Sequence, residues 1–493
     1  MPSFPLRSAA AKHTGRTALR EGPNAWTYAQ LLGASDSMAA ALLGDRRDLC
    51  EERIGVLLPA GLDYAAAQWG AWRAGGVFVP LSTGATGKEI SYFLADAEIS
   101  CLVTTREMAA EMTAPGDVRV LSVEDALSVQ PCEYPSIAGT RRAMMLYTSG
   151  TTSKPKGVVT THDCMAAQIS SLVEAWRWSD SDRIPLFLPL HHVHGIVNVL
   201  SCALWSGATV DTFARFDTAE IFPRVAQDAY TVFMAVPTIY VKMIEALEAM
   251  DSAERAEVAG GFARMRLMVS GSAALPAGIH RRWEEMTGQK LLERYGMTEI
   301  GMALSNPYEG ERRPGAVGLP LPGVSVRLKN DAGTVVSGED EPGEIQVRGP
   351  SVFLEYWKRP EITAESFDEG WFRTGDIAVR EKGYYRIMGR SSVDIIKSGG
   401  YKLSALEIET ALLDHPDVAE CAVLGIEDST WGECVAAAIV PAAKAKLDET
   451  ALRAWCKERM SPYKVPRLLR FVESLPRNAM GKVTKPAVKK VFD

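Results

Sequence analysis

The feature that most limits the fold of this chain is an alternation of strand-like apolar segments with helical patterns over its first 390 residues. The strand-like segments are residues 54–59, 77–80, 99–104, 231–236 and 265–269. A helical pattern at residues 64–72 separates the first two of them. Strands that alternate with helices are typical of parallel sheets covered by helices. We therefore predict an α/β fold of layered subdomains for this region.

The pattern changes twice toward the C-terminal end. Short strand-like segments with Gly and Asp turns follow one another at residues 324–329, 343–348 and 383–388, which predicts a small β-rich unit. After Arg390 the chain has a compact α+β pattern, whose first clear helix is expected at residues 406–413. We therefore predict a large N-terminal domain of residues 1–390 and a small C-terminal domain of residues 391–493.

Length and composition agree with an enzyme of more than one domain. The chain has 493 residues, of which 47% are hydrophobic and 23% are charged. Its net charge of −7 offers no general attraction to nucleic acid or to an anionic membrane. No apolar run approaches the length of a membrane span. The eight cysteines include no Cys-x-x-Cys pair, so we interpret them as reduced thiols in a reducing compartment.

The N-terminal segment has two interpretations. Its first 20 residues contain four basic residues and no acidic residue, which is similar to a weak mitochondrial transit peptide. The alternative is an ordinary helix at residues 6–13 that packs on the domain. We favour the helix, because no spare segment separates it from the next predicted element at residues 25–28. We therefore expect a cytoplasmic protein, with mitochondria as the alternative compartment.

A loop of small hydroxyl residues lies between two strand-like runs. Residues 147–157 read Tyr-Thr-Ser-Gly-Thr-Thr-Ser-Lys-Pro-Lys-Gly. Small residues let the backbone approach a polyanion, and successive N–H groups can bind it. The loop lacks the spacing of a Walker loop and has no clear helix after it. Taken alone, it is equally well interpreted as a phosphate-binding loop or as a flexible surface loop.

Three further motifs carry residues suited to binding parts of ATP. In the segment at residues 293–299, Tyr295 can stack on adenine, Thr298 can reach a phosphate and Glu299 can bind Mg²⁺. The alternative there is a strand end with a tight turn. Asp376 follows a turn and can accept both hydroxyl groups of a ribose. Lys482 follows Gly481 near the C-terminus, where an isolated lysine is usually only solvated.

Together these motifs resemble the acyl-adenylate-forming superfamily, which includes acyl-CoA synthetases, firefly luciferase and the adenylation domains of peptide synthetases. The Thr-Ser-Gly-Thr-Thr loop, Tyr-Gly-x-Thr-Glu, Thr-Gly-Asp and the C-terminal Gly-Lys occur in the order of that family and span nearly the whole chain. One departure is Ser153, where the family usually has glycine; we expect it to stiffen the loop without abolishing activity. The resemblance implies that ATP binds between a large N-terminal domain and a small mobile C-terminal domain.

The resemblance also implies roles for individual residues. Catalysis would depend on Lys482, Thr298 and Glu299, and Mg²⁺ would be held by Thr148 and Glu299. The residues implied to bind ATP or CoA are Thr148, Ser149, Gly150, Thr151, Thr152, Lys156, Ser272, Ala273, Tyr295, Asp376, Arg390, Gly399 and Gly400. The small domain would rotate about a hinge within residues 391–394, so that one site serves two half-reactions. Lys482 would act in the first, and residues 398–401 would face the approaching thiol in the second.

The implied chemistry is coherent. A carboxylate is a poor acyl donor, and attack on the α-phosphate of ATP converts it into a mixed anhydride with AMP. Negative charge then develops on the α-phosphate and on the departing pyrophosphate. A lysine, Mg²⁺ and loop N–H groups are suited to neutralising that charge.

Arg294 indicates which kind of acid supplies the acyl group. It directly precedes Tyr295, where many relatives have glycine, and would point toward the acyl pocket. A guanidinium there suits a second carboxylate, which it can hold with two hydrogen bonds. The surrounding segments look closest to those of the malonyl-CoA synthetases. The alternative is a structural arginine paired with Glu293 or Glu299.

A run of histidines at residues 191–194 could suggest a metal site, but three histidines in four positions cannot converge on one ion, and no acid or cysteine adjoins them. The run instead matches a family loop that lines the acyl pocket, with His192 as the matching residue. It would hydrogen-bond the substrate or shape the pocket wall. Residues 236–238 match another wall of that pocket.

We therefore predict an ATP-dependent, AMP-forming acid–thiol ligase that makes malonyl-CoA, or a close short dicarboxylyl-CoA, from the acid, ATP and CoA, with Mg²⁺. One alternative is a CoA ligase for a short or medium monocarboxylic acid. Another is a catalytically silent binding protein of the same fold, against which the intact Lys482, Glu299 and Asp376 argue. A peptide-synthetase module is less favoured, because nothing follows Asp493. We expect no nucleic-acid partner and leave the oligomeric state open.

Overall fold

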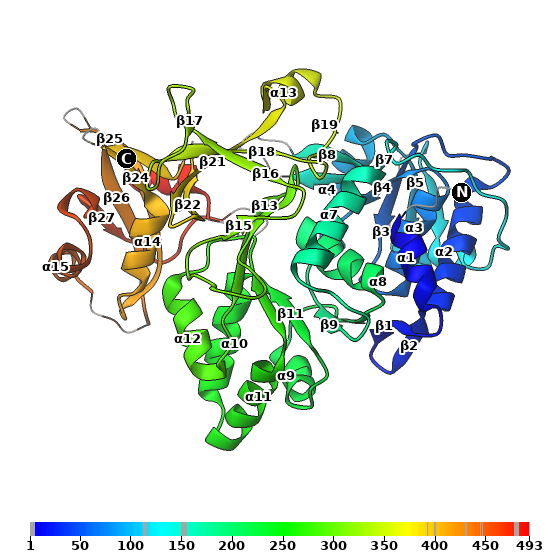
Figure 1. The fold of residues 1–493 in the computed structure, drawn as a ribbon, viewed down its shortest axis with the longest axis horizontal. Helices are drawn as coiled ribbons and strands as arrows, with labels where there is room; N and C mark the ends of the chain where they lie inside the picture. The colour runs from blue at the N-terminus through cyan, green and yellow to red at the C-terminus, as the bar shows by residue number, and fades with distance from the viewer. Residues whose placement is uncertain are drawn as a thin grey trace.

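The computed structural model describes residues 5–111, 116–148, 155–391, 393–398, 401–428, 431–443, 445, 447–477 and 483–492. Figure 1 shows a large N-terminal domain, coloured from blue to yellow, beside a small C-terminal domain in orange and red. This mixed α/β architecture confirms the predicted fold class. Within the described ranges, no helix combines the length and apolar character needed to cross a lipid bilayer.

The first sheet contains the strands predicted nearest the N-terminus. Its order is β19 (Glu355–Tyr356), β8 (Lys156–Thr161), β7 (Arg142–Thr148), β4 (Val77–Pro80), β3 (Arg53–Leu57), β5 (Ile99–Thr104) and β6 (Arg119–Ser122). Strands β7, β4, β3, β5 and β6 are parallel, whereas β8 pairs antiparallel with both β7 and β19. The helices of this region are α2 (Tyr28–Leu43), α3 (Leu62–Arg73), α4 (Gly87–Asp96), α5 (Arg106–Glu111), α6 (Val123–Ala126) and α7 (His162–Ala175).

Two further sheets complete the layered part of the N-terminal domain. One has the order β11 (Val232–Ala235), β12 (Leu267–Ser270), β13 (Leu292–Met297), β14 (Gly301–Ser305) and β15 (Leu319–Pro320). Its helices are α9 (Thr218–Ala226), α10 (Pro237–Ala249), α11 (Ser252–Arg264) and α12 (Ala277–Thr287). The other sheet has the order β2 (Asn24–Thr27), β1 (Thr17–Glu21), β10 (Thr209–Thr212) and β9 (Arg183–Leu186).

The β-rich unit and the C-terminal domain follow as predicted. The β-rich unit has the strand order β17 (Val335–Val336), β16 (Ser325–Lys329), β18 (Gly343–Arg348), β21 (Trp371–Glu381) and β20 (Phe367–Asp368). Strand β22 (Tyr384–Arg390) pairs with β21. Helix α13 (Pro360–Glu365) lies between β19 and β20 along the chain. The C-terminal sheet has the order β24 (Tyr401–Ser404), β23 (Ile395–Ser398), β26 (Gly432–Pro441) and β25 (Val418–Asp428), with β27 (Leu468–Phe471) beside β26. Its helices are α14 (Ala405–Leu413), α15 (Glu449–Arg459), the 3₁₀ helix Pro462–Lys464 and α16 (Lys485–Lys489). This domain has a hydrophobic core of its own. The domain boundary after residue 390 stays a prediction.

The N-terminal segment belongs to the folded domain. Helix α1 (Pro5–Ala10) continues into the 3₁₀ helix Ala11–His13. Leu6 and Ala10 are buried, and Arg7 forms an ion pair of 3.0 Å with Asp36 on α2. These contacts confirm the helix predicted at residues 6–13.

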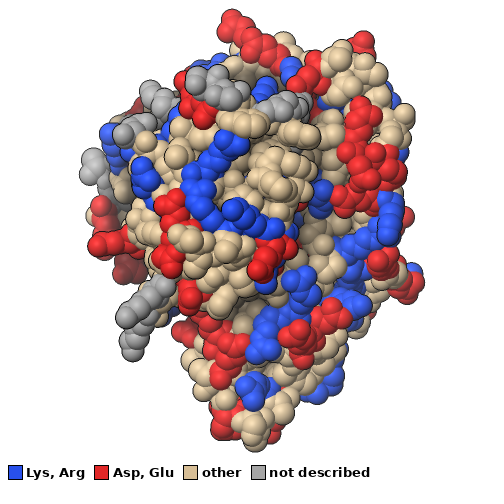
Figure 2. All heavy atoms as spheres, turned by 90° about the vertical axis from the view of Figure 1, so that its left-hand side faces the viewer, with Lys and Arg blue, Asp and Glu red and all other residues tan. Residues whose placement is uncertain are grey.

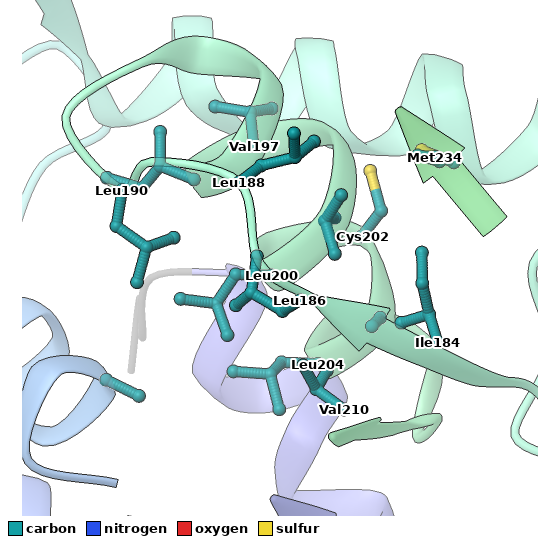
Figure 3. Close-up of a cluster of buried hydrophobic side chains, with 14 of the residues drawn as sticks. Ile184, Leu186, Leu188, Leu190, Val197, Leu200, Cys202, Leu204, Val210 and Met234 are labelled. Atoms are coloured by element: carbon teal, nitrogen blue, oxygen red, sulfur yellow. The ribbon is translucent and has the colours of Figure 1, made fainter. Parts of the chain in front are cut away.

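A π-helix (His194–Ser201) and α8 (Cys202–Ser206) are held against strand β9 by buried aliphatic side chains. Figure 3 shows this cluster, in which Leu186 and Leu188 lie beside Leu200 and Val197. At the start of the π-helix, a Cβ atom on Gly195 would lie 2.5 Å from the backbone oxygen of Pro189, so only glycine permits this approach. The π-helix is therefore fixed by packing on one side and by a close backbone contact at its beginning.

Asp182 joins two of the sheets through an ion pair with Arg266, whose side chain is 23% exposed. It directly precedes β9 and is 1% exposed, and both of its carboxylate oxygens lie 2.6 Å from the guanidinium of Arg266, which directly precedes β12. Thr231, directly before β11, donates its hydroxyl to the same carboxylate at 2.8 Å. One side chain thus fixes the beginnings of three strands.

We expect Asp182→Ala to lower the free energy of unfolding of the N-terminal domain by about 3–5 kcal/mol, because it leaves the Arg266 charge without its partner in a poorly solvated site. Urea denaturation of the purified proteins measures the change. Asp180→Ala is the matched control, because Asp180 is half-exposed and pairs with Arg16 at 3.7 Å; its expected cost is about 0–1 kcal/mol. Equal costs for both variants would contradict the assignment.

Glu293 is a buried carboxyl group on β13. It is 6% exposed, and its Oε1 accepts a hydrogen bond of 2.7 Å from the backbone N–H of Gly315. Burial raises the pKa of Glu293 to about 8, although the N–H group of Gly315 acts in the opposite direction. The folded protein therefore retains a proton that the unfolded chain, with an ordinary pKa near 4.5, releases.

The stability contributed by a group of this kind is present below its unfolded pKa and is lost as the pH rises through the folded pKa. We therefore expect Glu293 to lower the free energy of unfolding by about 3–5 kcal/mol as the pH rises from about 4.5 to 8. In Glu293→Gln the amide oxygen can still accept the bond from Gly315, and this pH dependence should disappear. Urea denaturation of both proteins at pH 5, 6.5 and 8.5 isolates the effect as a difference, and parallel profiles would exclude it.

Candidate active site

Tyr295, Asp376 and Arg390 form one hydrogen-bonded unit, although they come from three different strands. Tyr295 on β13 donates its hydroxyl to Oδ2 of Asp376 on β21 at 2.5 Å. The other oxygen of Asp376 lies 2.9 Å from Nε of Arg390 on β22. Burial raises the pKa of Asp376, and the charge of Arg390 opposes that rise. The structure thus brings three of the predicted nucleotide-binding residues together.

Glu299 forms a second group with residues from β8 and β19. It is 5% exposed, and its Oε1 accepts a 2.8 Å hydrogen bond from the hydroxyl of Tyr356 on β19. The ammonium of Lys156 on β8 lies 4.4 Å from the centre of the Tyr356 ring. Burial raises the pKa of Glu299, and the hydrogen bond from Tyr356 lowers it. Thr298 is partly exposed beside Glu299.

These residues fit a magnesium ion that is bound mainly by substrate phosphates. Among the residues that the structure describes, no group of three or more acidic, histidine or cysteine side chains could hold a metal. Mg²⁺ usually retains several waters and binds one or two carboxylates together with phosphate oxygens. Glu299 can supply the carboxylate, and Thr148, at the end of β7, a hydroxyl oxygen. The donor set therefore suits a metal that arrives with a nucleotide.

The two ends of the predicted phosphate loop are held by helix α4. Thr148 on β7 pairs with Lys156 on β8. On the side of β7, the Tyr147 hydroxyl donates to Asp96 at 2.8 Å; on the side of β8, the Tyr92 hydroxyl donates to the backbone oxygen of Pro155 at 2.7 Å. Asp96 and Tyr92 both lie on α4.

The predicted residues outside the described ranges are Ser149, Gly150, Thr151, Thr152, Gly399, Gly400 and Lys482.

Arg294 is buried without a carboxylate partner. It is 4% exposed, and its Nη2 donates a 3.3 Å hydrogen bond to the hydroxyl of Ser272. Among the described residues, Arg294 forms no ion pair, either with Glu293 or with Glu299. Its Nε also has no hydrogen-bond acceptor among them. Burial lowers the pKa of Arg294 to about 9. The structure therefore argues against a structural ion pair at this position.

His194 and Ser272 complete the surroundings of this guanidinium. Nδ1 of His194 lies 3.1 Å from the Ser272 hydroxyl, and its Nε2 has no hydrogen-bond partner. Burial, and then the charge of Arg294, lowers the pKa of His194 and keeps the imidazole neutral. Ser272 is exposed and has a φ of +71°, which is rare for a residue other than glycine. Because Ser272 is exposed, the cluster opens to solvent beside the exposed Ala273.

The sequence prediction chose His192 from the histidine run, whereas the structure places His194 at Arg294. The ring of His192 lies 4.3 Å from that of His191. His194 begins the π-helix, and such helices are frequent at functional sites. A π-helix is not visible in the apolar pattern, so the sequence offered no signal to prefer His194. The substrate-binding role of His192 stays a prediction.

The C-terminal domain exposes aromatic side chains close to basic ones. Tyr401 is 56% exposed and stacks on Tyr463 with ring centres 4.6 Å apart. The guanidinium of Arg467 lies 4.2 Å from the centre of the Trp431 ring. Figure 2 shows the face that carries this domain, where Lys and Arg side chains gather beside uncharged surface. Aromatic rings and cations together suit a nucleotide or a phosphate-bearing ligand.

Comparisons with known proteins identify the family. A family model described as AMP-binding enzyme matches residues 6–357, and one described as AMP-binding enzyme C-terminal domain matches residues 407–482. A mitochondrial malonate–CoA ligase of Mus musculus (ACSF3) is 44% identical over 473 residues, which cover 89% of this chain and 81% of the relative.

Two solved structures show similar folds. The chain matches ATP-bound MatB from Rhodopseudomonas palustris with a TM-score of 0.88 and 32% identity, covering 99% of both chains. It matches a malonyl-CoA ligase ternary product complex with methylmalonyl-CoA and AMP with a TM-score of 0.70 and 39% identity, covering 96% of this chain and 100% of the other. This chain therefore belongs to the AMP-binding enzyme family, as an ATP-dependent, AMP-forming acyl-CoA synthetase.

Proposed function

We propose that this protein forms malonyl-CoA, or a closely related short dicarboxylyl-CoA, from the free acid, ATP and CoA. The observation that supports a dicarboxylic acid as the substrate is the buried guanidinium of Arg294, which has no carboxylate partner among the described residues. An uncompensated buried charge is costly unless a ligand neutralises it. The distal carboxylate of malonate would do so, and Ser272 and His194 would supply further hydrogen-bonding groups. The similarity to malonate–CoA ligases supports the same substrate.

In the adenylation step, the substrate carboxylate would attack the α-phosphate of ATP and pyrophosphate would leave. Asp376 would accept the ribose hydroxyls, beside Tyr295 as the adenine platform. Lys156 and Thr148 flank the loop that would bind the phosphates. Mg²⁺ would neutralise phosphate charge as it forms, with Glu299 and Thr148 as its protein ligands, and Lys482 would contact the α-phosphate. Burial of Asp376 and Glu299 keeps competing water away from these contacts.

In our proposal, the orientation of the small domain relative to the large one is the orientation used in the adenylation half-reaction. The TM-score with the ATP-bound relative is higher than that with the product complex, although the product complex is more similar in sequence. A rotated domain lowers a TM-score without any change of fold. We place the hinge within residues 391–394, between the end of β22 and the start of β23.

The acceptor surface for CoA would lie on the C-terminal domain. Tyr401 follows the Gly399–Gly400 pair that the family resemblance assigns to the thiol channel. The ring of Tyr463, stacked on Tyr401, and the ring of Trp431, with the charge of Arg467, offer stacking and phosphate contacts. The mouse relative is described as mitochondrial, so mitochondria stay an alternative to the cytoplasm for this chain.

The function is tested by acid-dependent ATP–pyrophosphate exchange with malonate, methylmalonate, succinate, acetate, butyrate and benzoate, followed by detection of the acyl-CoA product. Malonate or methylmalonate should give the highest kcat/KM. A preference for butyrate or benzoate would identify a monocarboxylate ligase, and no exchange with any acid would indicate a silent member of the fold.

We expect Arg294→Met to lower kcat/KM for malonate by about thirty- to several thousandfold, because the distal carboxylate loses a charge contribution of about 2–5 kcal/mol. Butyrate carries no distal charge, so its kcat/KM should stay level or rise. Pyrophosphate exchange with both acids measures the change. Arg281→Met, at an exposed arginine on α12, is the matched control and should affect neither acid. A uniform loss for both acids in Arg294→Met would mean that the arginine is structural.

We expect Asp376→Ala to raise the KM for ATP by about ten- to a hundredfold, because a charge-assisted hydrogen bond of about 1.5–3 kcal/mol to the ribose is lost. The ratio of kcat/KM for malonate to that for butyrate should remain constant, since Asp376 lies on the nucleotide side of β13. Asp331→Ala, at an exposed carboxylate of the same β-rich unit, provides the control. An altered preference between acids with an unaltered KM for ATP would place Asp376 elsewhere in the site.

A further inference from the structure

The C-terminal domain contains a buried cluster of three charged side chains that the proposed reaction does not use. Nζ of Lys485, the first residue of α16, lies 2.6 Å from Oδ1 of Asp394 and 2.9 Å from Oε1 of Glu409 on α14. The three side chains are only 12–15% exposed. Burial works against the charge of Lys485, yet its pKa is raised because Glu409 and Asp394 outweigh the cost of desolvation. The lysine therefore remains an ammonium that two carboxylates hold in place.

The carboxylate of Asp394 has a different partner on each oxygen. While Lys485 binds Oδ1, Oδ2 accepts a 2.9 Å hydrogen bond from the backbone N–H of Arg390. The backbone N–H of Asp394 also donates to the oxygen of Arg390 at 2.8 Å. These two bonds close a turn across the proposed hinge. The approach is close, because a Cβ atom on Gly389 would lie 2.3 Å from the Cβ of Asp394.

The same turn is connected to the nucleotide side of the site. Arg390, whose N–H group binds Asp394, places its guanidinium 2.9 Å from Asp376, and Asp376 accepts the hydroxyl of Tyr295. Charged and polar contacts thus run without interruption from Tyr295 through the hinge turn to Lys485. Lys485 follows Lys482 by three positions, and its helix is anchored by the fully buried Val488.

Rotation of the small domain about residues 391–394 would break the hydrogen bond between the Arg390 N–H and Asp394. The contacts of Asp394 and Glu409 with Lys485 lie within the small domain and would move with that domain. Lys485 fixes the orientation of the Asp394 carboxylate and so keeps Oδ2 directed at Arg390. We infer that Lys485 is a positioning residue for the adenylation half-reaction, because through Asp394 it holds the hinge turn in the domain orientation seen here. This inference rests on the proposed ligase function.

The test is Lys485→Met, which keeps an unbranched side chain close in length to lysine and removes its charge. Two half-reactions are measured: malonate-dependent ATP–pyrophosphate exchange, and malonyl-CoA formation from supplied malonyl-adenylate and CoA. We expect the kcat of exchange to fall about ten- to a hundredfold through mispositioning, with the KM for malonate and the thioester step changed by less than about threefold. Lys485→Arg should restore exchange, because it returns the charge.

Two control variants separate positioning from stability. Glu409→Gln removes a charge from the cluster but leaves the contact between Lys485 and Asp394, and Lys489→Met removes an exposed lysine from the same helix. Both should retain the two half-reactions. If Lys485→Met does not fold, Asp394→Asn applies the same test at the other end of the contact and should cause the same selective loss.

An equal loss in both half-reactions, or no loss in either, would overturn the inference. The wild-type protein is tested first with the full panel of acids. If it adenylates an acid other than malonate, the proposed substrate is wrong and the variants are compared with that acid instead, so that the role of Lys485 is judged separately. An absence of exchange with every acid would overturn both the function and the inference.

Discussion

The alternation of side chains along strand β13 is the constraint on which the proposed active site depends. Glu293 and Tyr295 are directed to one face of the strand, where they bind Gly315 and Asp376. Arg294 lies between them and is directed to the opposite face, toward Ser272. Successive residues of a strand necessarily point in opposite directions. The proposed nucleotide contacts and the proposed acyl contacts are therefore separated by a single residue of sequence and by the thickness of one strand.

This separation explains how one scaffold can accept different acids while keeping the same nucleotide chemistry. A substitution at Arg294 would change the face that borders β12 and the π-helix, and is expected to leave the pair of Asp376 and Arg390 intact. Two arginines of the N-terminal domain, Arg266 and Arg294, show the contrast between a paired and an unpaired guanidinium. Arg266 is neutralised by Asp182, whereas the partner of Arg294 among the described residues is a serine hydroxyl. A buried cation that lacks a carboxylate partner is available to an anionic ligand.

The sequence predicted the layered α/β domain, the β-rich unit and the C-terminal domain, because each has a local period or turn composition that can be read from short windows. It also assigned Tyr295, Asp376 and Arg390 to one nucleotide site; the structure brings the three side chains into contact, and their roles stay a prediction. The surroundings of Arg294 could not be predicted in the same way. Whether the guanidinium of Arg294 has a partner depends on residues from three distant segments. The choice between His192 and His194 depends on a π-helix, which cannot be recognised in the apolar pattern of the sequence. The contact of Lys485 with Asp394 joins residues far apart in the chain and is equally invisible in the sequence.

Helix α4 has a consequence for the thermodynamics of nucleotide binding. Tyr92 and Asp96 hold the two flanks of the loop between β7 and β8, so the distance between its ends is set when the domain folds. Bringing the ends of a loop together costs conformational entropy. Here that entropy is lost during folding and would not be subtracted from the affinity of the proposed loop for ATP, which is the general advantage of a preorganised site. The hydroxyls of Tyr92 and Tyr147 thus preorganise the proposed phosphate loop by joining its two flanks to α4.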